Sequence, residues 1–221
     1  MRQYLLGVLT GVFLGIAASN VWGMGAPRIY HKYAPTVVQV MTENGSGTGV
    51  IVNRSGDVLT NAHVVEELDA EVRIITYPGD ALYEAKVIKI DKVKDLALLD
   101  IKGHSLNWKH VRIKKVNVYV GQDVYSIGHP LGRDWSISNG IISAKQRFYY
   151  GSYRTQSTVI TNPGSSGSPL FDRKGNLIGL VRGLVIATPF SGFSGISIAV
   201  TLDDIIDFMT IKPRYKLGDL K

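Results

Sequence analysis

The sequence predicts an all-β fold, and three features of the chain lead to that class. From Thr36 onwards, short runs of apolar and β-branched residues alternate with turns rich in glycine, proline, asparagine and aspartate. These runs recur at a regular spacing. The chain has 221 residues, of which 45% are apolar, so it can bury a core as one domain or as two small lobes. Such strands build a sandwich or barrels, and the pattern alone leaves both architectures open.

The first half of the chain contains five segments with the composition of strands. Turn residues separate them, such as the Asn-Arg-Ser-Gly-Asp sequence at 53–57 and the Pro-Gly-Asp sequence at 78–80. A connector with alternating basic and apolar residues follows at 102–117. We expect strands at Val37–Met41, Gly47–Val52, Glu71–Tyr77, Glu84–Ile90 and Leu96–Ile101.

The second half repeats this pattern and closes with a helix. Residues 172–176 form a typical hairpin turn. Thr201 is a good helix N-cap, and Asp203 and Asp204 suit the first turn of a helix, so a short helix is predicted after Thr201. We expect strands at Asp123–Gly128, Ser136–Ala144, Thr155–Ile160, Ser168–Phe171, Leu177–Val185 and Gly195–Val200.

Residues 1–26 differ in composition from the rest of the chain. Arg2 precedes an apolar run, and small residues at 17–19 form a candidate cleavage site, so the segment is either a signal peptide or an uncleaved transmembrane anchor. Small residues at 7, 11, 15, 19 and 23 would line one face of an apolar helix and favour the anchor. Residues 27–34 indicate a short linker or entry segment. The predicted organisation is therefore 1–26 as signal or anchor, 27–213 as one folded domain, and 214–221 as a tail.

Charge and cysteine content narrow the classes of partner. The net charge is +7 and the pI is about 9.5, but the basic residues are scattered and no run has the length of a polybasic tail. We therefore expect solvated strand faces and no nucleic-acid partner, with a membrane contacted through the N-terminal helix. The chain has no cysteine, which excludes disulfides and thiol chemistry. We expect no metal and no cofactor.

The segment 162–170, with the sequence Asn-Pro-Gly-Ser-Ser-Gly-Ser-Pro-Leu, has the composition of a tight turn around one serine. Gly164 and Gly167 allow the backbone to bend sharply, and no Cβ blocks the approach of a substrate. Such a turn can expose one hydroxyl and aim two backbone N–H groups at one point, where an oxyanion would develop. A serine nucleophile also needs a histidine and a carboxylate from elsewhere in the chain.

Both partners occur in suitable segments. His63 lies in Thr-Asn-Ala-His-Val-Val, directly after a short apolar strand, and Asp95 opens the strand Asp-Leu-Ala-Leu-Leu. The chain order His, Asp, Ser is the chymotrypsin order. These blocks resemble the chymotrypsin-fold serine proteases, and most closely the bacterial high-temperature-requirement (Deg-type) branch, which typically carries TNAHVV, DLALL and NPGNSGGPL. The resemblance extends from about Ala34 to Val200.

The resemblance implies a fold and a mechanism. The fold would be two six-stranded antiparallel β-barrels, with lobes at about 34–105 and 118–200, a short C-terminal helix and a site between the lobes. Ser166 would be the nucleophile, His63 the general base and Asp95 the group that orients the imidazole. Gly164 and Ser166 would supply the N–H groups of the oxyanion hole. Peptide bonds would be hydrolysed through an acyl-enzyme.

Neighbouring residues compete for these roles. Asp91 and Asp100 are rivals of Asp95, which alone directly precedes the Leu-Ala-Leu-Leu strand. The register Gly-x-Ser-Gly-x-Pro selects Ser166 over Ser165 and Ser168. In this chain Ser165 replaces the aspartate of trypsin-like zymogens, and Ser168 replaces a glycine and is expected to narrow the cleft. The remaining histidines lack a motif and are expected to be structural: His31, His104, His110 and His129.

The same register indicates a specificity pocket. Ile160 would form an apolar floor, which favours small or medium aliphatic side chains in the substrate. Arg182 and Gly183 would form the wall that pairs with the substrate backbone, and Gly195 would leave the opposite wall open.

The resemblance further implies a bacterial envelope location and a possible homotrimer, and we expect none of the PDZ modules that many family members carry. Two alternatives remain at this stage. One is an inactive protease fold that binds peptides at a membrane, and the other is a membrane scaffold.

Overall fold

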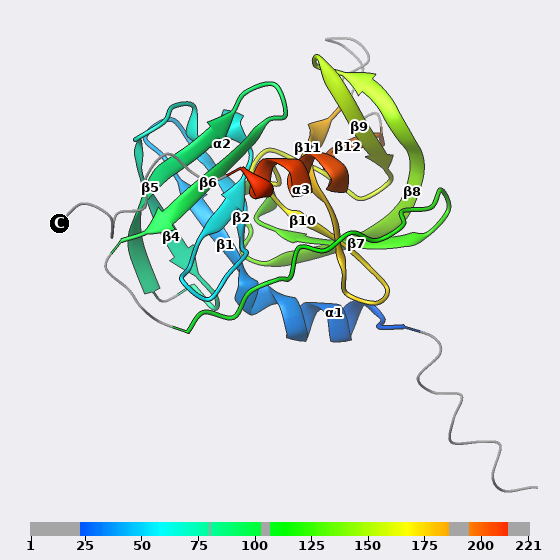
Figure 1. Ribbon diagram of the computed structural model, residues 1–221. Helices are drawn as coiled ribbons and strands as arrows, with labels where there is room; N and C mark the ends of the chain where they lie inside the picture. The colour runs from blue at the N-terminus through cyan, green and yellow to red at the C-terminus, as the bar shows by residue number, and fades with distance from the viewer. Residues whose placement is uncertain (1–22, 80, 103–106, 186–194, 212–221) are drawn as a thin grey trace, which may run out of the picture.

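The computed structural model describes residues 23–79, 81–102, 107–185 and 195–211, and within them the chain forms two β-barrels side by side (Figure 1). Each barrel is closed and contains six antiparallel strands. The prediction of an all-β, two-barrel fold with a short C-terminal helix is confirmed.

The first barrel has the strand order β1-β2-β3-β6-β5-β4. The predicted bounds of β1 and β6 match those of the structure, and β5 begins three residues earlier than predicted because residues 81–83 continue its pairing with β4. The strands are β1 (Val37–Met41), β2 (Ser46–Ile51), β3 (Val58–Thr60), β4 (Glu71–Thr76), β5 (Ala81–Asp91) and β6 (Leu96–Ile101).

The second barrel has the order β10-β11-β12-β9-β8-β7. The main difference from the prediction is a longer hairpin, since β8 and β9 stay paired as far as Tyr149 and Ser152. Residues 145–149 of this extension are polar or aromatic and largely exposed, so burial alternation does not mark them as strand. The strands are β7 (Asp123–Gly128), β8 (Ser136–Tyr149), β9 (Ser152–Ser157), β10 (Pro169–Asp172), β11 (Leu177–Leu184) and β12 (Ser197–Thr201).

Three apolar clusters hold the molecule together. One fills the first barrel and one fills the second, through residues such as Ile74 and Leu170. The third draws on both barrels, for example through Leu59 and Leu180, and on two helices. Because this shared cluster is buried, the two barrels are held in a fixed relation.

The segment 27–34, predicted as a linker or entry segment, is the helix α1 (Ala26–Tyr33), which leads into the 3₁₀ turn η2 (Ala34–Thr36). Pro27 near its N-terminus favours a helix start. Ile29 and Tyr33 are four residues apart and buried, and Tyr33 stacks on Phe171 of the second barrel with ring centroids 4.4 Å apart. An eight-residue helix has too few turns for its apolar stripe to stand out in the sequence.

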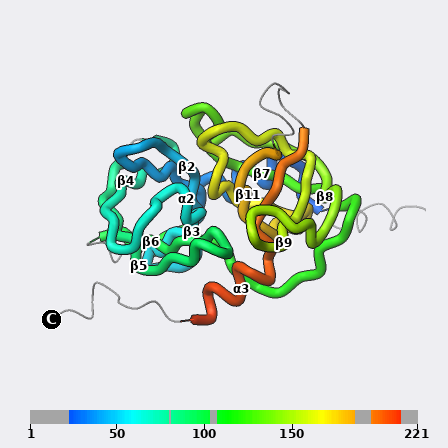
Figure 2. The backbone as a smooth tube through the Cα atoms, turned by 90° about the horizontal axis from the view of Figure 1, so that it is seen from above, coloured from blue at the N-terminus to red at the C-terminus, as the bar shows by residue number. Residues whose placement is uncertain are grey.

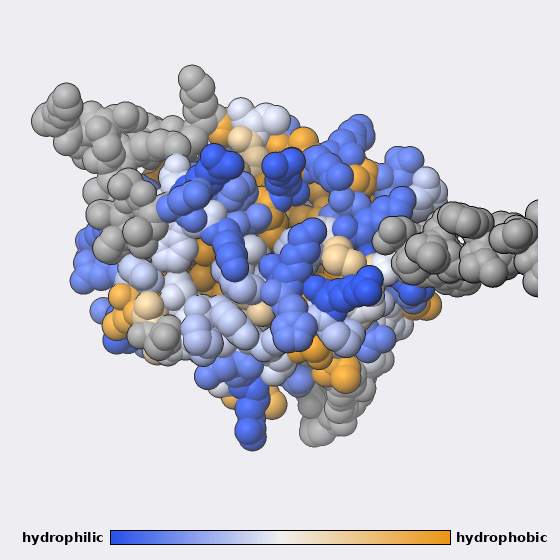
Figure 3. Space-filling view, turned by 90° about the horizontal axis from the view of Figure 1, so that it is seen from below, coloured by the Kyte–Doolittle hydropathy of each residue, from blue (hydrophilic) through white to orange (hydrophobic). Residues whose placement is uncertain are grey.

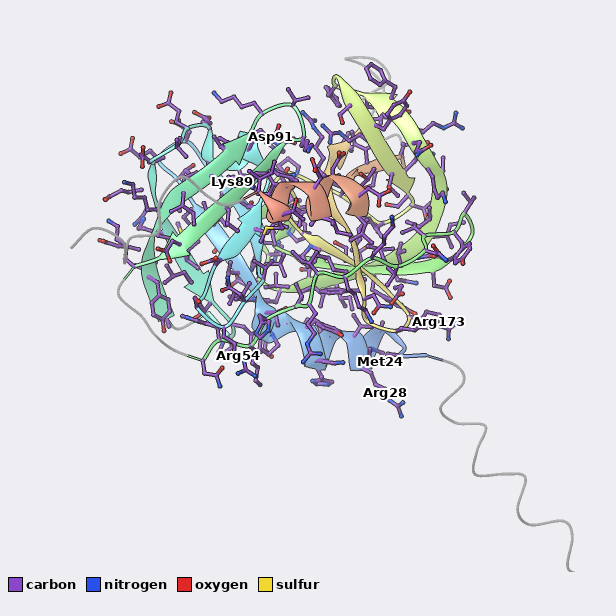
Figure 4. All side chains as sticks on the ribbon, viewed as in Figure 1. Met24, Arg28, Arg54, Lys89, Asp91 and Arg173 are labelled. Atoms are coloured by element: carbon purple, nitrogen blue, oxygen red, sulfur yellow. The ribbon has the colours of Figure 1, made fainter. Side chains whose placement is uncertain are left out.

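The underside of the molecule, where α1 runs, is mostly polar, with smaller apolar areas between the polar side chains (Figure 3). At the start of α1, Met24 N donates to Arg173 O at 2.5 Å, so the second barrel anchors the beginning of the helix. Arg28 projects away from the barrels (Figure 4).

The predicted C-terminal helix is confirmed as α3 (Leu202–Thr210). Asp204 N donates to Thr201 Oγ1 at 3.2 Å, which is the predicted N-cap. The helix follows the second barrel but reaches the first, where Lys89 Nζ of β5 donates to Ile211 O at 2.6 Å (Figure 4). Viewed from above, α3 lies where the two rings of strands meet (Figure 2).

Most of the predicted signal peptide or anchor, residues 1–22, lies outside the described residues, as do His104 and the predicted tail. In the ranges that the structure does describe, no helix combines the length and apolar character needed to cross a membrane.

Candidate active site

His63 lies in the short helix α2 (Ala62–Val65), directly after β3. In the register between β3 and β6, Thr60 pairs with Ala97. His63 follows Thr60 by three residues and Asp95 precedes Ala97 by two, so these two residues lie close together. His63 Nδ1 lies 2.9 Å from Asp95 Oδ2 and 3.0 Å from Oδ1. A carboxylate only accepts hydrogen bonds, so Nδ1 carries the proton and Nε2 of the neutral ring is free to accept one.

Asp95 is held in place through its backbone as well as its side chain. It is 5% exposed and has a left-handed φ of 60° in the turn between β5 and β6. Asn61 Nδ2 donates to Asp95 O at 2.9 Å, and His63 N donates to its Oδ1 at 3.0 Å. A left-handed conformation is strained for a residue with a side chain, and these bonds compensate for that strain.

The rival aspartates have other positions. Asp91 accepts from the N–H groups of Val93 and Lys94 at 3.0 and 2.8 Å, which builds the turn before Asp95. Asp100 lies inside β6. Among the described residues, Asp95 is the one carboxylate that contacts His63.

Ser166 lies in the loop between β9 and β10 and is half-buried, whereas Ser165 and Ser168 are 5% and 1% exposed. Its Oγ donates to Arg182 O of β11 at 2.9 Å, and in the described part of the chain no hydrogen bond joins it to His63. Thr48 N of β2 donates to Ser166 O at 2.7 Å, which ties the serine loop to the first barrel.

Gly164 and Gly167 fit their positions only because they lack a side chain. Their φ angles are +90° and +88°. A Cβ on Gly164 would lie 2.3 Å from His129 O, and one on Gly167 would lie 1.8 Å from Thr48 O. The loop therefore packs against backbone from both sides, as the glycines in its sequence predict.

The amides of Gly164 and Ser166 have no acceptor among the described residues. Ser165 N closes a turn onto Asn162 O at 2.9 Å, and Leu131 N binds Pro163 O at 2.7 Å. In a trans peptide the C=O and N–H point in opposite directions, so the Gly164 N–H points away from Leu131. Two unpaired amides within one turn could bind a negatively charged oxygen.

Thr48 and His129 hold the serine loop between β9 and β10 in place. Thr48 Oγ1 donates its single proton to Gly164 O at 2.8 Å. The contact of 3.2 Å between Thr48 Oγ1 and His129 Nδ1 must then have the imidazole as donor. Burial lowers the pKa of His129 to about 4, so the ring is neutral near pH 7. His129 is therefore structural, as expected, but no sequence signal identified Thr48 as its partner.

The side chain of Arg182 makes contacts that the sequence did not predict. Its Nε lies 3.0 Å from Asp95 Oδ2, and its guanidinium lies over the ring of Tyr150, 3.9 Å from the centroid. Arg154 of β9 donates to Val93 O and Lys94 O at 3.0 and 2.8 Å, just before Asp95. Both arginines have ordinary strand surroundings in the sequence, so nothing in it marks them as neighbours of Asp95.

The remaining pocket residues are only loosely grouped. Ile160 is 62% exposed and lines a cavity of about 170 Å³ together with Ser138 and Ser165. Gly183 follows Arg182 in β11, and Gly195 has a φ of 71°. Ser168, which is expected to narrow the cleft, lines the same cavity, and its side chain is buried against Gly128.

Comparison with known proteins identifies the family of this chain. Residues 47–180 match the family model described as "Trypsin-like peptidase domain". The chain is 36% identical over 192 residues to a probable periplasmic serine endoprotease DegP-like of Ectopseudomonas mendocina, covering 81% of this chain and 39% of the relative. It is 36% identical over 206 residues to the magnetosome formation protease MamE of Paramagnetospirillum magneticum, covering 90% and 28%. The chain thus spans less than half the length of these curated relatives.

A solved structure of a serine endoprotease from Yersinia pestis superposes with a TM-score of 0.71 at 28% identity, covering 85% of this chain and 66% of that one. Its likeness extends over both barrels. The chain belongs to the trypsin-like peptidase family and is related to its Deg-type serine endoproteases.

Proposed function

We propose that this protein is a serine endopeptidase that hydrolyses peptide bonds through His63, Asp95 and Ser166. The observation that carries the proposal is the hydrogen-bonded pair of His63 and Asp95, with Nδ1 bound to the carboxylate and Nε2 left to act as a base. A bare serine hydroxyl is a weak nucleophile near neutral pH and needs such a base.

In the proposed reaction, Ser166 Oγ first turns from Arg182 O towards His63. His63 takes the hydroxyl proton as Oγ attacks the substrate carbonyl, and the Gly164 and Ser166 amides stabilise the oxyanion. His63 then protonates the leaving amine, and an acyl-enzyme forms on Ser166. Water, deprotonated by His63, then attacks the ester, and His63 returns the proton to Ser166 Oγ as the C–O bond breaks and the peptide acid leaves. Asp95 holds the imidazole tautomer and stabilises its charged form throughout.

The substrate and location follow from the same proposal. The substrates are protein or peptide segments that reach the site in an extended form, cut after small or medium aliphatic residues because Ile160 offers an apolar surface. Relatives named as periplasmic support a bacterial envelope location. The N-terminal 26 residues act as a signal peptide or anchor, and a homotrimer is the proposed assembly.

The hydrogen bond between Ser166 and Arg182 O favours a second candidate function, a protease fold that binds peptides without cutting them. In that case the hydroxyl stays on the carbonyl and never reaches His63. A chemical probe of serine reactivity separates the two functions.

The test is labelling with a fluorophosphonate, which reacts only with an activated serine. We expect the wild-type protein to label, Ser166→Ala to lose all labelling, and the matched variants Ser165→Ala and Ser168→Ala to retain it. Labelling that survives Ser166→Ala would show that another serine is the nucleophile. A folded wild-type protein that binds peptides and does not label would establish the binding module instead.

A further inference from the structure

We propose that the underside of the molecule is a docking surface for a membrane that contains anionic phospholipids. Exposed basic residues of α1, of the turn between β2 and β3, and of the connector after the first barrel form this surface. We call it the basic face, and its members are Arg28, Lys32, Arg54, Lys109 and Arg112. Its role is separate from catalysis and goes beyond the proposed function.

Helix α1 separates apolar side chains from basic ones. Ile29 and Tyr33 are buried against the barrels, whereas Arg28 and Lys32 are exposed. These two basic residues are four positions apart, so they lie on the same side of the helix. The helix contains no aspartate or glutamate, and Arg28 points away from the barrels (Figure 4). The outer side of α1 therefore presents two positive charges to the solvent.

The connector after the first barrel brings further positive charge to the underside. Val111 is 2% exposed and belongs to the same apolar cluster as Ile29 and Tyr33 of α1. Lys109 and Arg112 are exposed, and residues 107–118 contain no aspartate or glutamate. The first part of this connector runs along the lower part of the molecule (Figure 1).

The turn between β2 and β3 places Arg54 next to this connector. Trp108 N donates to Arg54 O at 3.2 Å, and the Arg54 side chain is exposed. Arg54 lies on the same lower side of the molecule as Arg28 (Figure 4). Asp57, three residues further along the chain, is 4% exposed and accepts from Asn53 Nδ2 at 2.7 Å. The carboxylate of Asp57 is therefore held inside the turn and does not pair with Arg54.

Ion pairs within the protein leave the charges of the basic face free. Among the residues that the structure describes, none of its five side chains forms an ion pair with a carboxylate. Other surface lysines do form such pairs, for example Lys86 with Asp69 at 2.8 Å. The fold thus gathers basic residues that are scattered in the sequence and leaves their charges to attract an anionic partner.

An anionic membrane fits this face better than a nucleic acid does. The underside combines strongly hydrophilic side chains with smaller apolar areas over its whole width (Figure 3). Single-stranded nucleic acids bind through aromatic rings that stack on bases. The aromatic residues of α1 and the connector are already packed on other rings of the protein, as Tyr30, Tyr33 and Trp108 show.

The position of α1 in the chain supports the same partner. The apolar run that is predicted to be a signal peptide or anchor ends at Ala18, and α1 begins at Ala26. With an anchor in the bilayer, the short segment 19–25 would keep α1 and the basic face close to the lipid headgroups.

Docking through the basic face keeps the proposed catalytic residues accessible. Helix α1 lies at the lower end of the molecule, whereas α2, which contains His63, lies in the upper half (Figure 1). Asp91, on the turn that leads to Asp95, also lies in the upper half (Figure 4). A docked protein would therefore hold these residues away from the membrane, where protein segments in the solvent can reach them.

The test measures binding of the full chain to lipid vesicles by sedimentation. One set of vesicles contains phosphatidylcholine alone, and the other contains phosphatidylcholine and phosphatidylglycerol in equal amounts. The test variant replaces three residues of the basic face: Arg28→Gln, Lys32→Gln and Lys109→Gln.

The control variant removes the same net charge from exposed positions elsewhere, by Arg73→Gln, Lys92→Gln and Arg147→Gln. Arg73 pairs with Met41, at the end of β1 that is remote from α1. Lys92 lies on the turn between β5 and β6, and Arg147 lies on the β8–β9 extension. Both variants keep the N-terminal segment, so its contribution to binding is the same in all three proteins.

Each basic residue close to an anionic surface strengthens binding by about fivefold. We therefore expect the test variant to bind the phosphatidylglycerol vesicles about 100-fold more weakly than the wild type, and the control variant to bind them nearly as well as the wild type. Raising the salt from about 0.1 M to about 1 M shortens the screening length from about 10 Å to about 3 Å and should abolish the preference for phosphatidylglycerol.

Three results overturn the proposal. They are equal losses in the two variants, no preference of the wild type for phosphatidylglycerol, and a tighter, basic-face-dependent binding to duplex DNA at the same ionic strength. Urea unfolding verifies that the variants fold, and Arg28→Gln and Lys109→Gln as single changes, each with an expected loss of about fivefold, replace a triple variant that does not. Ser166→Ala should bind vesicles like the wild type, so a failure of the proposed function leaves this test intact.

Discussion

At the scale of single residues, Gly164 links backbone conformation to the proposed chemistry. Gly164 has a φ of +90°, and a Cβ added to it would lie 2.3 Å from His129 O. Any side chain at this position must therefore displace the loop. The amide that moves is one of the two proposed oxyanion donors. Glycine is therefore required at this position for two reasons, which are the positive φ of the turn and the close approach of His129 O.

We predict that Gly164→Ala lowers kcat by about 100- to 1,000-fold, the effect of losing one oxyanion donor. Gly151→Ala is the matched control, because Gly151 also has a positive φ, 77°, but a Cβ there would contact nothing within 4 Å. The two variants share the cost of backbone strain, so steady-state kinetics isolates the loss of the donor. Equal kcat values in the two variants would show that the Gly164 amide takes no part in catalysis.

At the scale of elements, β9 of the second barrel supports the turn that presents Asp95 from the first. Arg154 is 1% exposed, and its two terminal nitrogens bond the carbonyls of Val93 and Lys94. Burial lowers the pKa of Arg154, but an arginine stays charged at any pH of interest. The turn at 92–95 thus depends on a residue from the other barrel.

Arg154→Met should lower the free energy of unfolding by about 2 kcal/mol, because the carbonyls of Val93 and Lys94 lose a charged donor while the cost of burying that charge is relieved. kcat should fall by more than the loss of folded protein explains, because the backbone that positions Asp95 is no longer held. Urea unfolding and kcat measured at full folding separate the two effects. Arg147→Met, the exposed partner across the hairpin, should change neither, and similar losses in both variants would contradict the role of Arg154.

At the scale of the whole molecule, sequence reasoning was strongest where local pattern and chemistry coincide. The strands Val37–Met41, Leu96–Ile101 and Asp123–Gly128 were predicted to the residue because buried apolar residues define them. His63 and Asp95 could be paired from their motifs, and the register of β3 with β6 brings them together. Thr201 was recognised as a cap because capping depends only on neighbouring residues.

Contacts between segments that lie far apart in the chain could not be predicted from the sequence. Helix α1 is defined by packing against the second barrel, and the β8–β9 extension by pairing outside the core. Arg182 approaches Asp95 through a bulge that leaves no mark in the composition of β11. Thr48 and His129 lie 81 positions apart in the chain and meet only once both barrels are formed. A single sequence contains the chemistry of a site but only part of its geometry.

The contact between Thr48 and His129 joins the two barrels and makes the stability of the whole molecule depend on pH. The pKa of His129 is about 4 in the folded protein, against an ordinary value near 6.5 for the unfolded chain. Above pH 6.5 the ring is neutral in both states and its effect is constant. Between pH 6.5 and 4 the unfolded chain binds a proton that the folded protein does not, so stability falls as pH falls.

We predict that the low pKa of His129 lowers the free energy of unfolding by about 3 kcal/mol when the pH falls from 7 to 4. His129→Gln, which keeps a side-chain donor for Thr48, should lose that share of the pH dependence, while His31→Gln, at an exposed position of α1, should retain the wild-type slope. Urea unfolding at several pH values between 4 and 7 provides the measurement. If stability changes with pH equally in the wild type and in His129→Gln, then His129 is protonated in the folded state. In that case the contact between Thr48 and His129 does not depend on a neutral ring.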